Sequence, residues 1–361
     1  MSVPYPEIKK NLGFGCMRLP KIGDQIDNEE MCRMVDSFLE KGFNYFDTAH
    51  GYLDGKSEIA LRECLTSRHP RESYILANKL TGTFFQKQED IRPTFEAQLK
   101  ACGVEYFDFY LMHCQTSKSY PKFQACKAYE TAMELKAEGK FRHLAISFHD
   151  SADYLDKILT EHPEVEAVQI QFNYRDWENP KVESWKCYQV CRKHNKPIIV
   201  MEPVKGGKLV NLPPKAQQIF DELGGGSSAS YAIRFAAGFE GIFMVLSGMG
   251  SMEMMDDNTS YMADFQPLSE TEMAAVEKVR QILIDNEKIG CTGCRYCCDV
   301  CPQNIPIPEL FAAIDENRSF DNQEQVIKAG ECLNCGLCED ACPQHISIRE
   351  IISRTALIYN P

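Results

Sequence analysis

The chain has 361 residues, of which 44% are hydrophobic and 25% are charged, so a wholly disordered protein is excluded. Its 39 Lys and Arg against 52 Asp and Glu leave a formal net charge of −13. That balance argues against a protein that coats nucleic acid, because phosphate neutralisation needs a basic face. The first ten residues lack the apolar core of a signal peptide, and no later apolar run is as long as a membrane span. We therefore expect a cytoplasmic protein without nucleic acid and without a membrane span.

Short apolar runs alternate with amphipathic segments from residue 11 onwards. The runs are continuously apolar, which is typical of parallel strands buried on both faces. We expect strands at 12–17, 44–48, 74–79, 107–113, 143–148, 167–172, 197–202 and 242–247, and helices at 29–40, 58–65, 91–101, 123–137, 153–159, 182–194 and 229–236. Eight strands with intervening helices predict an α/β fold, the (β/α)8 TIM barrel. An open doubly wound sheet is the alternative, but the Gly-rich fingerprint expected after its first strand is missing.

Two longer segments follow the seventh expected strand. Residues 205–228 are rich in Gly and Pro, which predicts a surface loop over the C-terminal mouth of the barrel. Residues 270–287 form one helical pattern, and the cysteines become dense beyond it. We therefore expect a barrel over residues 1–282 and a small, mainly helical domain over 283–361, called here the cysteine-rich tail.

Four titratable residues stand at or just beyond the C-terminal ends of the second, third and fourth expected strands. They are Asp47, Tyr52, Lys79 and His113, and a barrel would bring all four to its mouth. A lysine ammonium beside a phenol favours its ionised form, and a carboxylate keeps that lysine charged. The tetrad is therefore a candidate catalytic site in which a phenol exchanges a proton and a histidine orients a carbonyl oxygen.

With this tetrad, and with the Asp-Thr-Ala-x-x-Tyr spacing that begins at Asp47, residues 8–260 resemble the aldo-keto reductase family. The resemblance implies a barrel that moves a hydride between NAD(P)(H) and a carbonyl, with the four residues as its catalytic tetrad. It also implies cofactor contacts at Ser147 and Gln169 for the carboxamide, at Gly206 and Gly207 for the pyrophosphate, and at Ser247, Gly248, Asp257 and Asn258 for the adenosine half.

The sequence departs from the family pattern at several cofactor positions. Gly248 and Met254 stand where family members commonly place the basic residues that bind the 2′-phosphate of NADP. NAD(H) is therefore expected to compete well with NADP(H). Lys205 and Lys208 are the cations that could supply a replacement charge.

Nine of the 17 cysteines lie in the cysteine-rich tail. Two copies of the run C-x2-C-x2-C-x3-C-P begin at Cys291 and Cys332, and this is the bacterial ferredoxin pattern, in which the fourth thiol ligates the other cluster. The expected metal ligands are Cys291, Cys294, Cys297 and Cys342 for one [4Fe–4S] cluster, and Cys332, Cys335, Cys338 and Cys301 for the second. Paired zinc ribbons are the alternative, but they need pairs of cysteines rather than triplets. Cys298 is left over as a spectator, and the tail resembles two-cluster ferredoxin domains.

Together these features predict an iron–sulfur oxidoreductase that reduces or oxidises a small carbonyl or alcohol. Because nicotinamide exchanges two electrons and a cluster exchanges one, we expect a flavin, a ferredoxin or flavoprotein electron partner, or a stepwise substrate to link them. Oxygen-labile clusters favour an anaerobe. Two alternatives stay open: an electron carrier or binding protein whose barrel is catalytically idle, and a carbonyl reductase whose iron–sulfur tail is purely structural.

Overall fold

The computed structural model describes residues 4–286, 289–315 and 328–359. Eight parallel strands close into a barrel in the order β1-β10-β9-β8-β7-β6-β5-β4. These strands are β1 (Leu12–Gly15), β4 (Tyr45–Asp47), β5 (Ile75–Leu80), β6 (Phe107–Gln115), β7 (Phe141–Phe148), β8 (Ala167–Gln171), β9 (Ile198–Met201) and β10 (Ile242–Ser247). All eight coincide with the strands expected from the sequence, and the predicted TIM barrel is confirmed.

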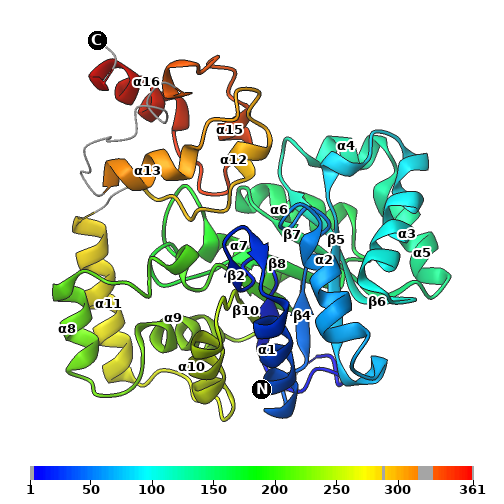
Figure 1. Ribbon diagram of the computed structural model, residues 1–361, viewed down its shortest axis with the longest axis horizontal. Helices are drawn as coiled ribbons and strands as arrows, with labels where there is room; N and C mark the ends of the chain where they lie inside the picture. The colour runs from blue at the N-terminus through cyan, green and yellow to red at the C-terminus, as the bar shows by residue number, and fades with distance from the viewer. Residues whose placement is uncertain (1–3, 287–288, 316–327, 360–361) are drawn as a thin grey trace.

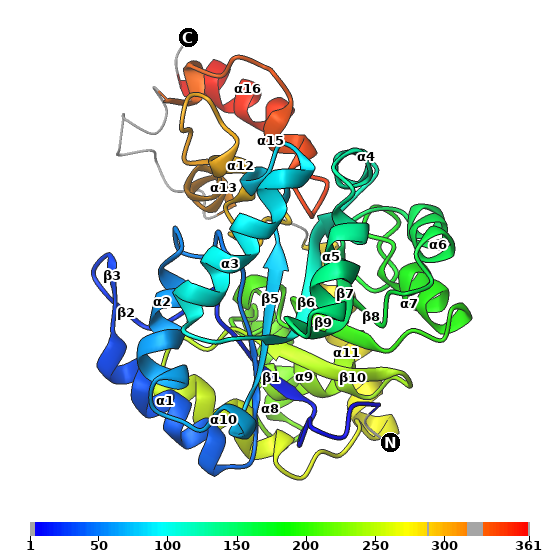
Figure 2. The ribbon, with the colours of Figure 1, turned by 90° about the vertical axis from the view of Figure 1, so that its right-hand side faces the viewer.

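Helices surround this barrel (Figures 1 and 2). In chain order they are α1 (Asn28–Glu40), α2 (Lys56–Leu61), α3 (Ile91–Cys102), α4 (Tyr120–Ala125), α5 (Ala128–Ala137), α6 (Ala152–Glu161), α7 (Ser184–Lys193), α8 (Pro214–Asp221), α9 (Ser228–Ala237), α10 (Met252–Met262) and α11 (Glu270–Asp285). Their apolar faces pack on the outside of the strands, while residues such as Tyr45, Phe109 and Phe243 fill the inside. Burial on both faces explains why the strands read as continuous apolar runs.

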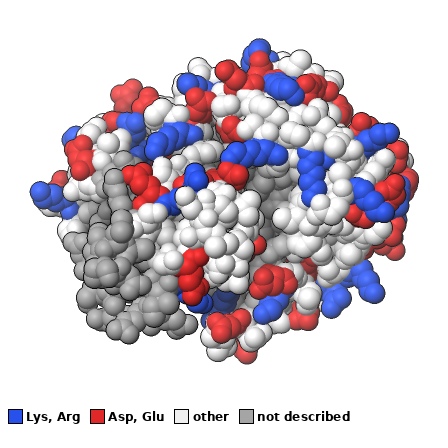
Figure 3. Space-filling view, turned by 90° about the horizontal axis from the view of Figure 1, so that it is seen from above, with Lys and Arg blue, Asp and Glu red and all other residues white. Residues whose placement is uncertain are grey.

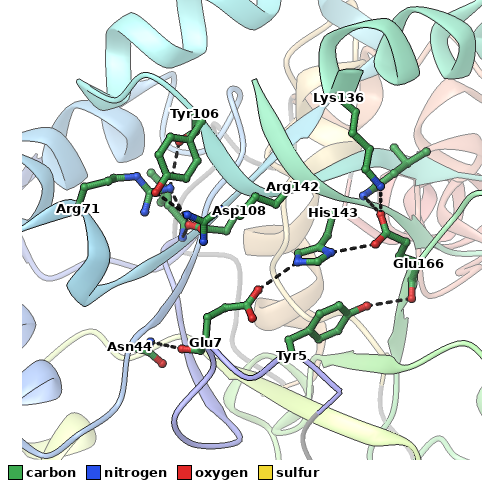
Figure 4. Close-up of polar contacts among 12 residues, drawn as sticks. Tyr5, Glu7, Asn44, Arg71, Tyr106, Asp108, Lys136, Arg142, His143 and Glu166 are labelled. Atoms are coloured by element: carbon green, nitrogen blue, oxygen red, sulfur yellow. Dashed lines mark hydrogen bonds and ion pairs between the residues drawn. The ribbon is translucent and has the colours of Figure 1, made fainter. Parts of the chain in front are cut away.

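The N-terminal segment closes the floor of the barrel, below the N-terminal ends of the strands (Figure 4). The ring of Tyr5 packs edge-on against Phe109, and its hydroxyl donates to the Glu166 carbonyl at 3.0 Å. His143 bridges the carboxylates of Glu166 and Glu7, at 2.9 and 3.0 Å. This polar network lies at the end of the barrel opposite the candidate site.

Three parts of the barrel differ from the expectation. The single helix expected at 123–137 is divided into α4 and α5. A short hairpin, β2 (Lys21–Ile22) and β3 (Gln25–Ile26), follows β1 where no strand was expected. The segment 205–228, expected to be a loop throughout, contains α8, which begins at Pro214. Proline suits the first turn of a helix because the first amide groups need no partner within the helix, so the Pro-rich stretch marks a helix start.

The cysteine-rich tail lies across the C-terminal ends of the strands (Figures 1 and 2). Its described helices are α12 (Tyr296–Asp299), α13 (Ile307–Asp315), α15 (Leu337–Asp340) and α16 (Ile348–Tyr359). They enclose a small core of their own around Leu310, Phe311 and Ile352. The domain boundary at 282/283 falls within α11 and stays a prediction.

The face that carries the tail shows no segregation of charge. Acidic and basic side chains are interspersed over the part of this face that Figure 3 colours. In the described parts of the chain, every helix falls short of the length and apolar character needed to cross a membrane.

Candidate active site and iron–sulfur centres

Three members of the tetrad stand on neighbouring strands. Asp47 is the last residue of β4, Lys79 lies near the end of β5, and His113 lies in β6. The register of β6 against β7 shifts between Met112 and Gln115, where His113 leaves the regular ladder. Tyr52 follows β4 in the turn before α2. All four side chains meet at the mouth of the barrel, as the strand-end positions predicted.

Lys79 is the centre of the site. Its Nζ contacts the Asp47 carboxylate, donates to the Thr48 carbonyl at 2.8 Å and donates to Tyr52 Oη at 3.3 Å. The side chain of Lys79 is 0% exposed and that of Asp47 is 4% exposed. A buried ion pair is costly to desolvate, so its presence at the mouth points to a purpose other than stability.

Burial and charge act on these groups in opposite directions. Burial raises the pKa of Tyr52, and the charge of Lys79 opposes this rise. For Lys79 itself burial would lower the pKa, but Asp47 and Tyr52 outweigh it and raise the pKa. The lysine therefore stays charged, and Tyr52 is a neutral phenol beside a cation, able to donate its proton.

His113 faces Tyr52 across the mouth, with their ring centroids 5.9 Å apart. Burial first, and then the charges of Lys79 and His149, hold the pKa of His113 well below its usual value. The Nδ1 atom lies 2.7 Å from Thr81 Oγ1. A Thr81 hydroxyl that donates to Nδ1 leaves Nε2 protonated, so the neutral ring can donate toward the mouth. Thr81 was not identified from the sequence. It lies two residues beyond Lys79, and residues two positions apart in a strand face the same side.

The cysteine-rich tail contributes a residue to this site. Tyr296, at the start of α12, lies beside Tyr52, and its ring lies edge-on to His113 at 6.3 Å between centroids. It also lies beside Cys114, whose thiol has its pKa raised by burial to about 12. No sequence signal marks Tyr296, which stands between two expected metal ligands.

The residues implied to hold the carboxamide line the same mouth, and both are buried. Ser147 Oγ accepts from the Cys114 amide at 2.8 Å, and Gln169 Nε2 lies 3.4 Å from the second Asp47 oxygen. Ser247 ends β10 and Gly248 follows it. Further along, Asp257 accepts from Ser227, and Asn258 donates to the Met254 carbonyl within α10. Their roles toward a cofactor stay predictions.

The loop implied to carry the pyrophosphate is covered by the cysteine-rich tail. A Cβ placed on Gly206, which has φ +64°, would lie 2.3 Å from the Thr292 carbonyl oxygen, so the two backbones touch. Lys205 Nζ pairs with Asp176 and donates to Gln344 at 3.1 Å. Lys208 donates to the Ile289 carbonyl at 2.5 Å. A phosphate held against Gly206 would meet the backbone of Thr292, whereas the space beside Gly207 is open.

Two cavities in the tail gather the eight expected ligands. One encloses about 310 Å³, part of it open to solvent, and is lined by Cys291, Cys294, Cys297 and Cys342. The other encloses about 340 Å³ and is lined by Cys301, Cys332, Cys335 and Cys338. The fourth thiol of each run thus lies in the cavity of the other run. Ile307 lines both cavities. Four thiols with apolar walls suit a [4Fe–4S] cluster, so the residues fit two clusters.

Comparison with known proteins agrees with this geometry. A model of the aldo/keto reductase family matches residues 11–281, three quarters of the chain. The chain belongs to the aldo/keto reductase family. It is thereby placed among oxidoreductases, and a 4Fe-4S dicluster domain matches residues 290–346.

Individual aldo/keto reductases resemble only parts of the chain in sequence. The NADH-specific methylglyoxal reductase of Escherichia coli is 29% identical over 197 residues, which is 48% of this chain and 57% of that protein. The chain spans from about a third to just under two thirds of the first curated relatives it matches.

Solved structures of the family share the barrel. An aldo-keto reductase from Klebsiella pneumoniae in complex with NADPH has a TM-score of 0.62 at 18% identity, covering 76% of this chain and 95% of that one. The holo form of an aldo-keto reductase from Bacillus halodurans has a TM-score of 0.60 at 24% identity, covering 75% and 92%. At these identities the likeness concerns the fold.

Proposed function

We propose that this chain is an oxidoreductase that interconverts a small carbonyl compound and its alcohol at Asp47, Tyr52, Lys79 and His113. The observation that carries the proposal is the contact of the buried Lys79 with both Asp47 and Tyr52. It supplies a phenol with a cation beside it and a carboxylate that holds the cation in place. The relatives' names support the carbonyl class, since one is a methylglyoxal reductase.

Tyr52 is the proton donor to the carbonyl oxygen in this proposal. As that oxygen gains electrons, it takes the phenolic proton, and the charge of Lys79 stabilises the phenolate that remains. The neutral His113 donates a hydrogen bond from Nε2 to the same oxygen, with Thr81 holding its other nitrogen. Asp47 touches neither the oxygen nor the proton and acts by positioning Lys79.

The cysteine-rich tail is proposed to hold two [4Fe–4S] clusters, one in each thiol-lined cavity. Bound there, each cluster would accept or donate one electron at a time. The electron partner is proposed to be a ferredoxin-like or flavin-containing carrier. Reduction of one carbonyl takes up two electrons and two protons, so each turnover needs two one-electron transfers, the proton that Tyr52 gives to the oxygen and a second proton, from water, that goes to the carbon.

A catalytically idle barrel is the first competing function. It is disfavoured by the buried ion pair, because an unused scaffold gains nothing from desolvating Lys79 and Asp47. A purely structural tail is the second. It is disfavoured by Tyr296, which brings the tail beside Tyr52 and His113 rather than leaving it on the outer surface of the barrel.

The experiment that tests the function uses the full chain purified without oxygen and loaded with iron and sulfide. A panel of small aldehydes and ketones that includes methylglyoxal is offered with NADH, NADPH or reduced methyl viologen, and alcohol formation is followed. We expect at least one carbonyl to be reduced and Tyr52→Phe to lower the rate by about 10²–10⁴-fold, the usual contribution of a general acid. Tyr188→Phe is the matched control, because the Tyr188 hydroxyl donates to Glu240 far from the mouth. Equal rates for Tyr52→Phe and wild type would remove Tyr52 from the mechanism.

A further inference from the structure

The cysteine-rich tail is attached to the rim of the barrel by contacts that converge on one stretch of it. Arg18, from the segment after β1, donates to the Thr292 carbonyl at 2.9 Å. The Thr292 hydroxyl contacts Glu202 at 3.3 Å, just after β9. The neighbouring Gly206 touches Thr292 backbone to backbone. The rim between the ends of β1 and β9 is therefore bridged by Thr292.

The same Glu202 places an already hydrogen-bonded carboxyl group at this rim. Its carboxyl group accepts from Gln344 at 2.8 Å and from Gln171 at 3.1 Å. Burial raises the pKa of Glu202, with Lys205 opposing the rise. A pyrophosphate brought to this place would lie beside the Glu202 carboxyl group. Lys205 is already paired with Asp176, and Arg18 already donates to the Thr292 carbonyl.

Deeper in the mouth, Tyr296 lies beside Tyr52 and edge-on to His113. A nicotinamide ring that delivers hydride to a carbonyl held by Tyr52 would have to share this part of the mouth with Tyr296. The tail thus stands both beside the tetrad and, through Thr292, against Gly206.

We infer that the attached cysteine-rich tail and a nicotinamide dinucleotide exclude each other at the barrel mouth, so that the chain with its tail attached does not bind NAD(P)H. The inference rests on the proposed function for the position of the tetrad, but it concerns binding and not turnover. It adds to that function the position of the tail, attached or detached, in which a dinucleotide or an electron carrier can act as reductant. Dinucleotide requires the tail to leave the rim, and a carrier that acts through the tail requires it to stay.

Binding is measured directly on the anaerobic, iron-loaded full chain by titration calorimetry with NADH and with NADPH. For wild type we expect no saturable binding up to about 1 mM of either dinucleotide. Saturable binding in the micromolar range by wild type, with the tail shown to be attached, would overturn the inference. Because no turnover is involved, failure of the carbonyl assay leaves this result unaffected.

A loosened tail provides the converse test. Lys118 pairs with Asp340 at the exposed edge of the tail, away from the tetrad and the covered loop. Asp340→Lys combined with Gln344→Ala replaces this attraction with repulsion and removes the bonds of Gln344 to Lys205 and Glu202. Adding Lys118→Asp restores the charge pair, and Arg92→Ala, which breaks only a surface pair with Glu138, is the neutral control.

Hydrogen exchange at residues 202–209 shows which variants free the rim, and iron content shows that the clusters persist. We expect the loosened variant to exchange faster and to bind dinucleotide at least tenfold more tightly than wild type, with restoration of the charge pair reversing much of both changes. Faster exchange without any gain in binding would overturn the inference, because the uncovered rim would then not be a dinucleotide surface. If hydrogen exchange at residues 202–209 does not change, the rim has stayed covered in the variant, and the titration of wild type alone tests the inference. Saturable binding by wild type overturns the inference, and the absence of binding supports it.

Discussion

Tyr296 lies beside Tyr52 at the mouth of the barrel, although 243 positions of the chain lie between them and they belong to different domains. Burial raises the pKa of Tyr296 most, and the charges of Tyr52, Cys114 and Cys294 raise it further. Tyr296 therefore keeps its proton and is placed to donate a hydrogen bond to the oxygen of Tyr52. A donor to that oxygen favours the phenolate, as Lys79 does.

Tyr296→Phe removes this donor and keeps the ring. Loss of one hydrogen bond to an ionised oxygen is worth roughly 1.5–3 kcal/mol, so we expect the apparent pKa of Tyr52 to rise by about one unit. The pH dependence of kcat with reduced methyl viologen as donor is the measurement. A profile that does not move, in a variant with unchanged iron content, would show that Tyr296 only packs against the site.

Removing one partner of the buried ion pair should destabilise the barrel more than removing both. Asp47→Asn leaves the charge of Lys79 buried without its carboxylate, which typically costs about 3–5 kcal/mol. The double variant Asp47→Asn with Lys79→Met leaves no buried charge and should recover much of that loss, while both variants stay inactive. Denaturant unfolding of the two variants measures the difference. A double variant less stable than the single one would show that the pair itself stabilises the fold.

The ligand sets predict different roles for neighbouring cysteines. Wild type should hold about eight irons, as two four-iron clusters require. Cys294→Ser should lower that number, because Cys294 lines a cavity, whereas Cys298→Ser should leave it unchanged, since Cys298 points its thiol at the Ile305 carbonyl at 3.6 Å. Anaerobic iron analysis compares the two. Equal losses, or zinc in place of iron, would contradict the assignment.

The floor network predicts how stability depends on pH. Burial would lower the pKa of His143, but Glu166 and Glu7 outweigh burial and raise that pKa above 6.5. The contribution of His143 to the free energy of unfolding is therefore complete below pH 6.5 and is lost as pH rises through the raised pKa. For Glu166, burial is outweighed by His143 and Lys136, which lower its pKa to about 2 from 4.5. Its contribution is complete above about pH 4.5 and is lost as pH falls toward 2.

The network of His143, Glu166 and Glu7 should therefore contribute most to the free energy of unfolding between about pH 4.5 and 6.5. We expect His143→Gln to cost about 1 kcal/mol of unfolding free energy at pH 6, the usual worth of such contacts, and less at pH 9. Urea unfolding of wild type and variant at both values is the measurement. A cost that is the same at both pH values would assign His143 a packing role only.

Patterns local in sequence predicted the barrel and the meeting of four side chains at its mouth, while the catalytic role of those four stays a prediction. Each buried strand carries its own apolar run, and the closure of a parallel barrel then brings Asp47, Lys79 and His113 to one mouth without further information. The partition of eight thiols between two cavities followed from the spacing of each run. The start of α8 at Pro214 was missed because proline was taken only as a loop residue.

Contacts between the two domains could not be predicted. The meeting of Tyr296 with Tyr52, and of Thr292 with Gly206, depends on how one folded surface fits another, and no periodicity in either segment encodes that fit. The glycines after β9 were interpreted as room for a phosphate. In the structure, Gly206 leaves room for the backbone of Thr292 instead.

The most direct test of electron exchange between the tail and the tetrad needs one anaerobic mixing experiment. The chain is reduced, freed of the reductant, and mixed with a carbonyl that wild type turns over, while the electron paramagnetic resonance signals of the clusters and the alcohol product are followed. We predict that the signals disappear as alcohol forms, with one alcohol for every two electrons lost, and that Tyr52→Phe slows both. Clusters that stay reduced beside a carbonyl that the same chain reduces with NAD(P)H would contradict the proposed function and leave the tail outside the reaction.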